Sequence, residues 1–168
     1  HEYIRFSVAP LAEHGVAQSD AAHRRFMDEV ILPAMLPAAI QLVFQHQVAG
    51  DQVVIVTATN EFVTRPIAQA FGVPELIAIE LERDAAGNPT GGIRGTPSFR
   101  EGKVARVEQW LASRGLSWAD VTHSSFYSDS INDLPLLEKV TEPVATNPDP
   151  RLSAIANERG WRILNLFE

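Results

Sequence analysis

Two carboxylates and an amide follow a short apolar run in the segment His123–Asp133. The run predicts a buried strand, and Asp129, Asn132 and Asp133 come directly after it. Parallel α/β folds bind ligands at the carboxyl ends of their strands, and carboxylate and amide oxygens suit a hard cation that keeps several waters, such as Mg²⁺. The alternative is an ordinary helix start, with Asp129 or Ser130 as the N-cap and Asp133 favouring the helix dipole.

The elements that would position these residues alternate along the chain. Residues 1–48 read as helical, with interruptions at Pro33 and Pro37. Beyond them we predict strands at 53–56, 76–81, 123–129, 143–146 and 162–166, helices at 61–71, 101–114 and 151–159, and a hairpin near 84–93. The β-branched run 53–56 is typical of a strand buried on both faces of a parallel sheet. Strands that alternate with helices predict an α/β fold with a largely parallel sheet.

Further polar groups fall at equivalent places in this scheme. Thr57 is predicted to end one strand, Lys103 to begin a helix, and Asp129 and Asp133 to follow another strand. A hydroxyl, an ammonium and a pair of carboxylates are the groups that metal-assisted phosphoryl transfer requires. Each also has a plain interpretation, as a strand threonine, a solvated first-turn lysine and a helix start.

The order and spacing of these groups resemble the phosphoserine-phosphatase-like branch of the haloacid dehalogenase superfamily. Residues 53–60 resemble its motif II, Lys103 its motif III lysine, and residues 128–133 its motif IV, GDSxND, with Ser128 in place of the glycine. The resemblance implies that residues 51–168 form a three-layer, Rossmann-like parallel sheet core. It also implies that residues 1–48 are part of a helical cap.

The resemblance further implies roles for single residues. Thr57 and the amide of Ala58 would bind the phosphate of the substrate, and Asn132 would also contact it. Lys103 would contact the phosphate and stabilise the nucleophile. Asp129 would be the Mg²⁺ ligand.

Asp133 would orient metal-bound water and pair with Lys103. The nucleophile itself is the first aspartate of a DxDx(T/V) motif in these phosphatases. No aspartate of this chain is followed by another two residues later. We therefore expect the nucleophile upstream of residue 1.

In the fold of the superfamily that this chain resembles, the strand that carries the DxDx(T/V) motif lies at the centre of the sheet, between the strands of motifs II and IV. The missing segment must therefore complete the sheet. Each buried backbone group left unpaired costs about 1–3 kcal/mol, against a total stability of about 5–15 kcal/mol. We therefore expect that residues 1–168 do not fold stably alone.

These observations predict a Mg²⁺-dependent phosphatase that hydrolyses a small phosphorylated metabolite, such as phosphoserine, through an aspartyl-phosphate. One alternative is a non-catalytic relative that binds Mg²⁺ or phosphorylated ligands. Another is a doubly wound signalling domain, although the helical start and the lysine before Asp129 count against it.

Composition excludes several classes of protein. The net charge of −7 disfavours nucleic acid as a partner, and the absence of cysteine excludes thiolate zinc sites and a cysteine nucleophile. No apolar run is long enough to span a bilayer. We expect a cytoplasmic enzyme.

Overall fold

The computed structural model describes residue 15 and residues 18–167, and the chain divides into two compact units, His1–Pro97 and Ser98–Glu168. The helix predicted at 2–13 lies outside the described residues. The units do not divide where a boundary between cap and core was predicted, near residues 48–51. The division into cap and core stays a prediction.

In the described part of the first unit, helical residues from 18 onward precede three strands. Its elements are η1 (Met27–Ile31), α2 (Leu32–Ala34), α3 (Pro37–Ala49), β1 (Val54–Asn60), α4 (Glu61–Ala70), β2 (Glu75–Arg83) and β3 (Pro89–Arg94). The helix break predicted near Pro33 and Pro37 is confirmed, because Leu36 is extended and Pro37 starts α3. Proline suits this first helical position since it has no N–H to leave unpaired.

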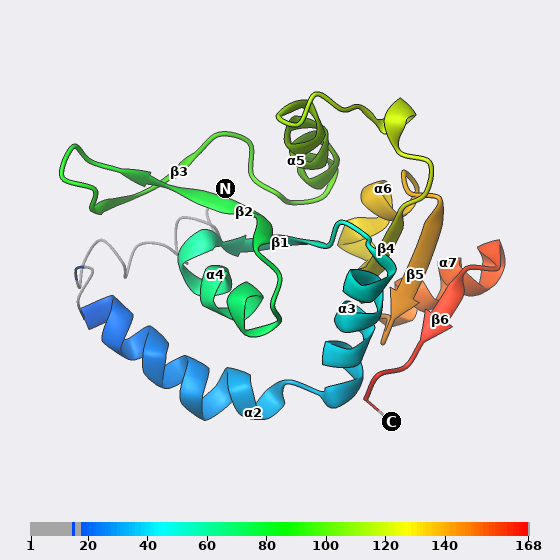
Figure 1. The fold of residues 1–168 in the computed structure, drawn as a ribbon, viewed down its shortest axis with the longest axis horizontal. Coiled ribbons are helices and arrows are strands. Elements are labelled where there is room, and N and C mark those ends of the chain that lie inside the picture. Colours follow the sequence, from blue (N-terminus) through cyan, green and yellow to red (C-terminus); the bar gives the residue numbers. More distant parts are fainter. Residues whose placement is uncertain (1–14, 16–17, 168) are drawn as a thin grey trace. The chain divides into compact units, whose positions relative to one another are not determined.

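The sheet of the first unit has the order β1-β2-β3. Strands β1 and β2 are parallel, and β2 and β3 form the antiparallel hairpin that was predicted. Helix α4 packs against β1 and β2 (Figure 1). Strand β2 is buried over Ile77, Ala78, Ile79 and Leu81, which gives this unit its apolar centre.

Strand β1 is longer than predicted, and Thr57 does not end it. The strand continues to Asn60, and its register against β2 shifts between Val56 and Asn60. Val56 pairs with Ile77 and Asn60 with Ile79, so residues 57–59 stand opposite Ala78 alone. The residues expected to follow the strand therefore form an irregularity within it, which periodicity alone does not reveal.

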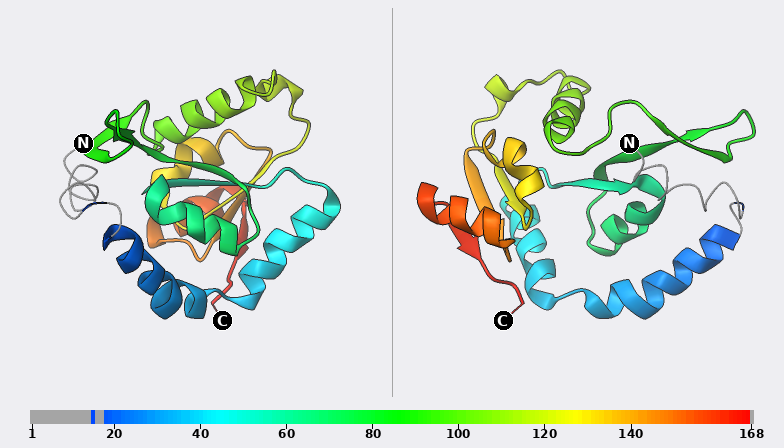
Figure 2. Two further views of the ribbon diagram at one scale, coloured as in Figure 1. Left: turned by 60° about the vertical axis from the view of Figure 1, so that its left-hand side comes forward. Right: turned by 180° about the vertical axis from the view of Figure 1, so that it is seen from behind.

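The second unit is a parallel sheet with helices. Its elements are α5 (Glu101–Ala112), η2 (Trp118–Asp120), β4 (Ser125–Ser128), η3 (Ile131–Asp133), α6 (Leu134–Leu137), β5 (Glu142–Thr146), α7 (Pro150–Arg159) and β6 (Arg162–Leu164). The strand order is β4-β5-β6, all parallel. Helix α7 lies along β5 and β6 (Figure 2). A core of Leu137, Ala145, Leu152 and Ala156 holds the unit together, with Phe126 and Trp161 packed against it.

Each sheet has an open edge among the described residues. Strand β1 ends one sheet and β4 ends the other, and each pairs on one side only within residues 18–167. The predicted α/β class with parallel strands is confirmed.

Within the described residues no single helix is long and apolar enough to cross a membrane, although the bent pair Gln18–Ala34 and Pro37–Ala49 meets the length and composition criteria when taken together.

Candidate active site

The turn after β4 carries the acidic residues and is ordered by its own serines. Ser128, the last residue of β4, accepts a hydrogen bond from the N–H of Ser130 at 3.2 Å. Ser130 in turn caps η3, because its hydroxyl accepts from the N–H of Asn132 at 3.2 Å. The segment is therefore a strand end and a helix start at once, and the two interpretations of the sequence do not exclude one another.

Lys103 and Asp133 form a buried ion pair. The ammonium Nζ lies 2.6 Å from Oδ1 and 2.7 Å from Oδ2 of Asp133, and the two side chains are 7% and 12% exposed. Lys103 is in the first turn of α5 but points inward, and its Nζ lies 5.8 Å from the centre of the Phe126 ring. The interpretation of Lys103 as a solvated first-turn residue is therefore wrong. A charge pair removed from water in this way interacts far more strongly than a surface pair.

Ser128 adds a third contact to the same carboxylate. Its hydroxyl donates to Oδ2 of Asp133 at 2.7 Å, and the residue is buried. The glycine of the motif has no side chain that could make this bond. In this chain the orientation of Asp133 is thus fixed from two directions, by an ammonium and by a hydroxyl.

Asp149 also holds this turn, and the sequence reasoning missed it. Its Oδ2 accepts from the N–H of Ile131 at 2.8 Å, and its own N–H donates to the carbonyl of Asp129 at 2.7 Å. Its Oδ1 caps α7 by accepting from the N–H groups of Arg151 and Leu152, both at 2.9 Å. The backbone N–H of Ile131, followed by that of Leu152, lowers the pKa of Asp149 below its usual value.

Only part of this arrangement could be found in the sequence. An aspartate before Pro150 indicates a helix N-cap, but nothing local indicates the bond to Ile131.

Arg100 is a second residue that was missed. It precedes α5, and its Nε donates to Oδ1 of Asn132 at 3.3 Å. The amide predicted to contact phosphate is therefore already engaged through its oxygen.

Thr57 and Ala58 belong to the first unit. The Thr57 hydroxyl accepts from the N–H of Thr59 at 3.1 Å, while Ala58 is exposed. Asn60 is buried and caps α4 by accepting from the N–H of Val63 at 3.1 Å. The joint action of Thr57 and Ala58 with Lys103 stays a prediction.

A model of haloacid dehalogenase-like hydrolases matches residues 2–138. The chain belongs to this family. The resemblance predicted from the motifs is confirmed.

Several curated proteins resemble this haloacid dehalogenase-like hydrolase. A histidinol-phosphatase of Neisseria meningitidis serogroup C is 45% identical over 97% of this chain and 73% of its own length. A phosphoserine phosphatase of Mycobacterium tuberculosis is 33% identical over 95% of this chain and 50% of its own length. The chain thus spans between half and three quarters of the length of these two relatives. The names support the coarse prediction of a hydrolase that acts on phosphate esters.

Solved structures agree with the fold. A Bordetella pertussis protein of unknown function superposes with a TM-score of 0.96 at 52% identity, over 99% of this chain and 74% of its own. A substrate-bound phosphoserine phosphatase superposes with a TM-score of 0.60 at 16% identity, over 97% of this chain and 79% of its own. The second similarity shows the fold alone.

The residues of this haloacid dehalogenase-like hydrolase fit Mg²⁺ through one carboxylate. The Asp129 side chain is exposed and accepts no hydrogen bond from the described residues, whereas Asp133 is committed to Lys103 and Ser128. No group of three His, Cys, Asp or Glu side chains that could hold a metal occurs within residues 18–167. Mg²⁺ is commonly held by one or two carboxylates with waters and substrate phosphate, so Asp129 suits the role of a single protein ligand.

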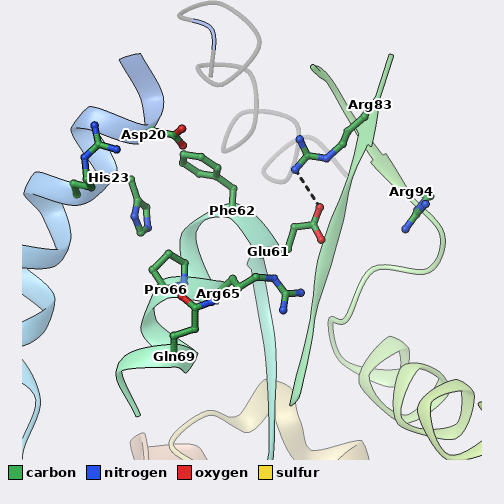
Figure 3. A pocket seen from close by; sticks show the side chains of 10 residues that line it. Asp20, His23, Glu61, Phe62, Arg65, Pro66, Gln69, Arg83 and Arg94 are labelled. Carbon is green, nitrogen blue, oxygen red and sulfur yellow. Dashed lines mark hydrogen bonds and ion pairs between the residues drawn. The ribbon is translucent and has the colours of Figure 1, made fainter. Parts of the chain in front are cut away.

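The first unit of this hydrolase also contains an open cavity of about 620 Å³, which none of the predicted site residues lines. Figure 3 shows Glu61 and Arg83 joined by an ion pair among the residues that line it, with their charged groups 3.5 Å apart. His23 lies beside Phe62, with ring centres 5.3 Å apart, and its Nε2 lies 2.9 Å from the carbonyl of Val63. These contacts of His23 are packing contacts between α4 and the helical residues before η1.

Proposed function

We propose that the protein is a Mg²⁺-dependent phosphatase that hydrolyses a small phosphomonoester through an aspartyl-phosphate. The observation that carries the proposal is the buried pair of Lys103 and Asp133, whose carboxylate comes from the turn that also carries Asp129. The pair places a fixed positive charge and an acidic turn at the end of a parallel strand. Phosphoryl transfer relies on positioning and on stabilising negative charge rather than on elaborate covalent chemistry.

The chemistry takes two displacements at phosphorus. A carboxylate oxygen attacks the phosphorus, the bond from phosphorus to the ester oxygen breaks, and the alcohol leaves with a proton. The proposal takes that proton from a general acid, the second aspartate of the DxD motif. Water then gives a proton back to this group and attacks the phosphorus of the acyl phosphate, the bond from phosphorus to the carboxylate oxygen breaks, and inorganic phosphate and the free carboxylate result. The proposal assigns the attacking carboxylate to a segment other than residues 1–168, since no aspartate here has the DxD spacing.

The residues of this chain bind and orient. Lys103 neutralises charge on the phosphoryl group, and Asp133 holds Lys103 in place and would orient water held by the metal. Asn132, Thr57 and the amide of Ala58 donate hydrogen bonds to phosphate oxygens. Mg²⁺, when bound at Asp129, supplies charge neutralisation for the transferring group.

Two features support a further segment that completes the sheet. The open edges of β1 and β4 present backbone groups with which another strand can pair. In addition, α3 has no buried residue, and Ile40, Phe44 and Val48 are 42%, 60% and 70% exposed at helical spacing. We propose that the segment with the nucleophile pairs with both edges and covers this apolar stripe.

The substrate class is inferred from the relatives. Histidinol phosphate and phosphoserine are both phosphate esters of a primary alcohol that carries an amino group. We propose a soluble phosphate ester of this class as the substrate, hydrolysed in the cytoplasm without nucleic acid or membrane as a partner.

The test is a hydrolysis assay with the purified protein, any accompanying chain left in place. Phosphoserine, histidinol phosphate and p-nitrophenyl phosphate are compared with and without Mg²⁺. Asp129→Asn is expected to weaken Mg²⁺ binding measured by calorimetry as well as turnover. Asp120→Asn is the matched control, because this carboxylate accepts hydrogen bonds only from Ser117 in the same unit.

Acid quenching during turnover should trap a phosphorylated carboxylate, located by peptide mass spectrometry. Absence of turnover with all three esters, while Mg²⁺ and phosphate still bind, would establish the non-catalytic alternative instead. The observation that favours this non-catalytic alternative is the lack of a DxD pair in residues 1–168.

A further inference from the structure

Arg100 has a backbone conformation that its residue type rarely adopts. Its φ is 51° and its ψ is −124°, a region that suits glycine because a Cβ is crowded there. The carbonyl of Phe99 accepts from the N–H of Gly102 at 2.9 Å, so Arg100 occupies the first central position of a tight turn. A glycine would make this turn without strain, which indicates that the arginine side chain is retained for another reason.

Another non-glycine residue of the same unit has a positive φ for which the fold supplies a reason. Asn147 is the other non-glycine residue with a positive φ, at 45°, among the residues that the structure describes. Asparagine tolerates this region, and its Oδ1 accepts from the N–H of Leu166 at 2.8 Å while its N–H donates to the carbonyl of Leu164. The Asn147 side chain itself holds its segment in place, whereas the backbone bonds at Arg100, from the N–H of Gly102 to Phe99 and from the N–H of Lys103 to the Arg100 carbonyl, would form with glycine as well.

The side chain of Arg100 reaches the acidic turn. Its Nε donates to Oδ1 of Asn132, and its guanidinium carbon lies 5.1 Å from the centre of the Phe99 ring. The residue is exposed and makes no ion pair with the described residues. Its Nη groups therefore remain available to an anion from solution.

The same bond fixes the orientation of the Asn132 amide. Because Arg100 has only donors, it must face the oxygen of the amide rather than its NH₂ group. The NH₂ group of Asn132 is then directed elsewhere and has no acceptor among the described residues. A cationic donor from the start of α5 and an amide donor from the turn that holds Asp129 thus lie side by side.

We propose that Arg100 and Asn132 together bind the phosphate of the substrate, with the Nη groups of Arg100 and the NH₂ of Asn132 as donors. The inference rests on the proposed function and assigns to that site a residue outside the motifs quoted above. Arginine suits the task, since its planar donors match the geometry of phosphate oxygens. The strained turn is the cost of directing this side chain toward the substrate.

The experiment compares Arg100→Gly, Arg100→Lys and Asn147→Gly in the protein as purified with any accompanying chain. Two quantities are measured for each variant: the dissociation constant of inorganic phosphate in the presence of Mg²⁺, by calorimetry, and the melting temperature. Where the protein turns over p-nitrophenyl phosphate, KM and kcat are measured separately. Inorganic phosphate tests binding even if no ester is hydrolysed.

Arg100→Gly is expected to raise the melting temperature, because strain is relieved, and to weaken phosphate binding. Loss of a hydrogen bond from a charged donor predicts a rise of about tenfold or more in the dissociation constant. KM should rise with kcat less affected, since the contact is made in the bound ground state as well. Arg100→Lys should retain part of the affinity, and Asn147→Gly should leave it unchanged.

An unchanged phosphate affinity in Arg100→Gly would overturn the inference. A fall in affinity that Asn147→Gly reproduces would also overturn it, since the cause would then be loosening of the unit. Wild-type protein that binds phosphate through Arg100 but hydrolyses none of the esters would overturn the proposed function and leave the inference standing.

Discussion

Replacing Lys103 by methionine should destabilise the protein more than any surface change of charge. The substitution keeps the length of the side chain but removes the ammonium that contacts both oxygens of Asp133. The carboxylate of Asp133 then stays buried with the Ser128 hydroxyl as its remaining donor. Breaking a buried ion pair by removing one partner costs about 3–5 kcal/mol.

A second lysine provides the control that separates the loss of the buried ion pair from the loss of a lysine in general. Lys139 carries the same charge, but its Nζ lies 3.8 Å from Glu108, and the two side chains are 44% and 49% exposed. Lys139→Met should change the free energy of unfolding by less than about 0.5 kcal/mol. The double variant Lys103→Met with Asp133→Leu removes both charges and should recover most of the loss, because an apolar pair avoids the desolvation penalty.

The assay is urea unfolding followed by fluorescence and circular dichroism, on protein purified with any accompanying chain. The free energies of Lys103→Met, Asp133→Leu and the double variant form a double-mutant cycle. A cost below about 1 kcal/mol for Lys103→Met would refute the reasoning. Additive effects of the two single changes would refute it as well, since they would mean that the two side chains do not interact.

Further substitutions test other contacts. Because the pKa of Asp149 is lowered in the native state, its ionised form stabilises the protein above the unfolded pKa, and this contribution is lost as the pH falls through the native pKa. The free energies of unfolding of wild type and Asp149→Asn, measured in urea, should therefore differ near neutral pH and converge in acid. A difference that stays constant with pH would contradict this. Ser128→Ala should cost about 1–3 kcal/mol by urea unfolding, because it removes a buried donor to a carboxylate, and a cost near zero would show that the bond contributes nothing. Asn60→Ala should cost about 1 kcal/mol by loss of the α4 cap, and an Asn60→Asp variant that does not recover most of it would speak against capping as the cause.

The parallel sheet and its helices could be predicted because their signals are local. The run from Val53 to Val56 and the turn before Pro150 indicate a strand and a helix start regardless of what they contact. The inward direction of Lys103 was also encoded, since it shares a helical face with Val107 and Leu111 at spacings of four residues, and all three are buried. Val104, the next residue along the helix, is by contrast only half-buried.

Other features depend on distant partners and left no local signal. The extension of β1 past Thr57 is set by its register against β2. The bond from Arg100 to Asn132 joins residues 32 positions apart. Nothing in the type of an arginine indicates a positive φ, so this turn became visible only in three dimensions.

The double role of Asp149 has a consequence for the order in which the protein acquires its site. The turn that carries Asp129 is hydrogen-bonded to Asp149, which follows β5 in the sequence. During synthesis, strand β4 and its acidic residues leave the ribosome first. The hydrogen bonds to Asp149 cannot form before β5 and the start of α7 have also been made. We expect nascent chains that stop short of Asp149 to hold Mg²⁺ poorly, so that the metal site matures late in folding even though its predicted ligand is made earlier.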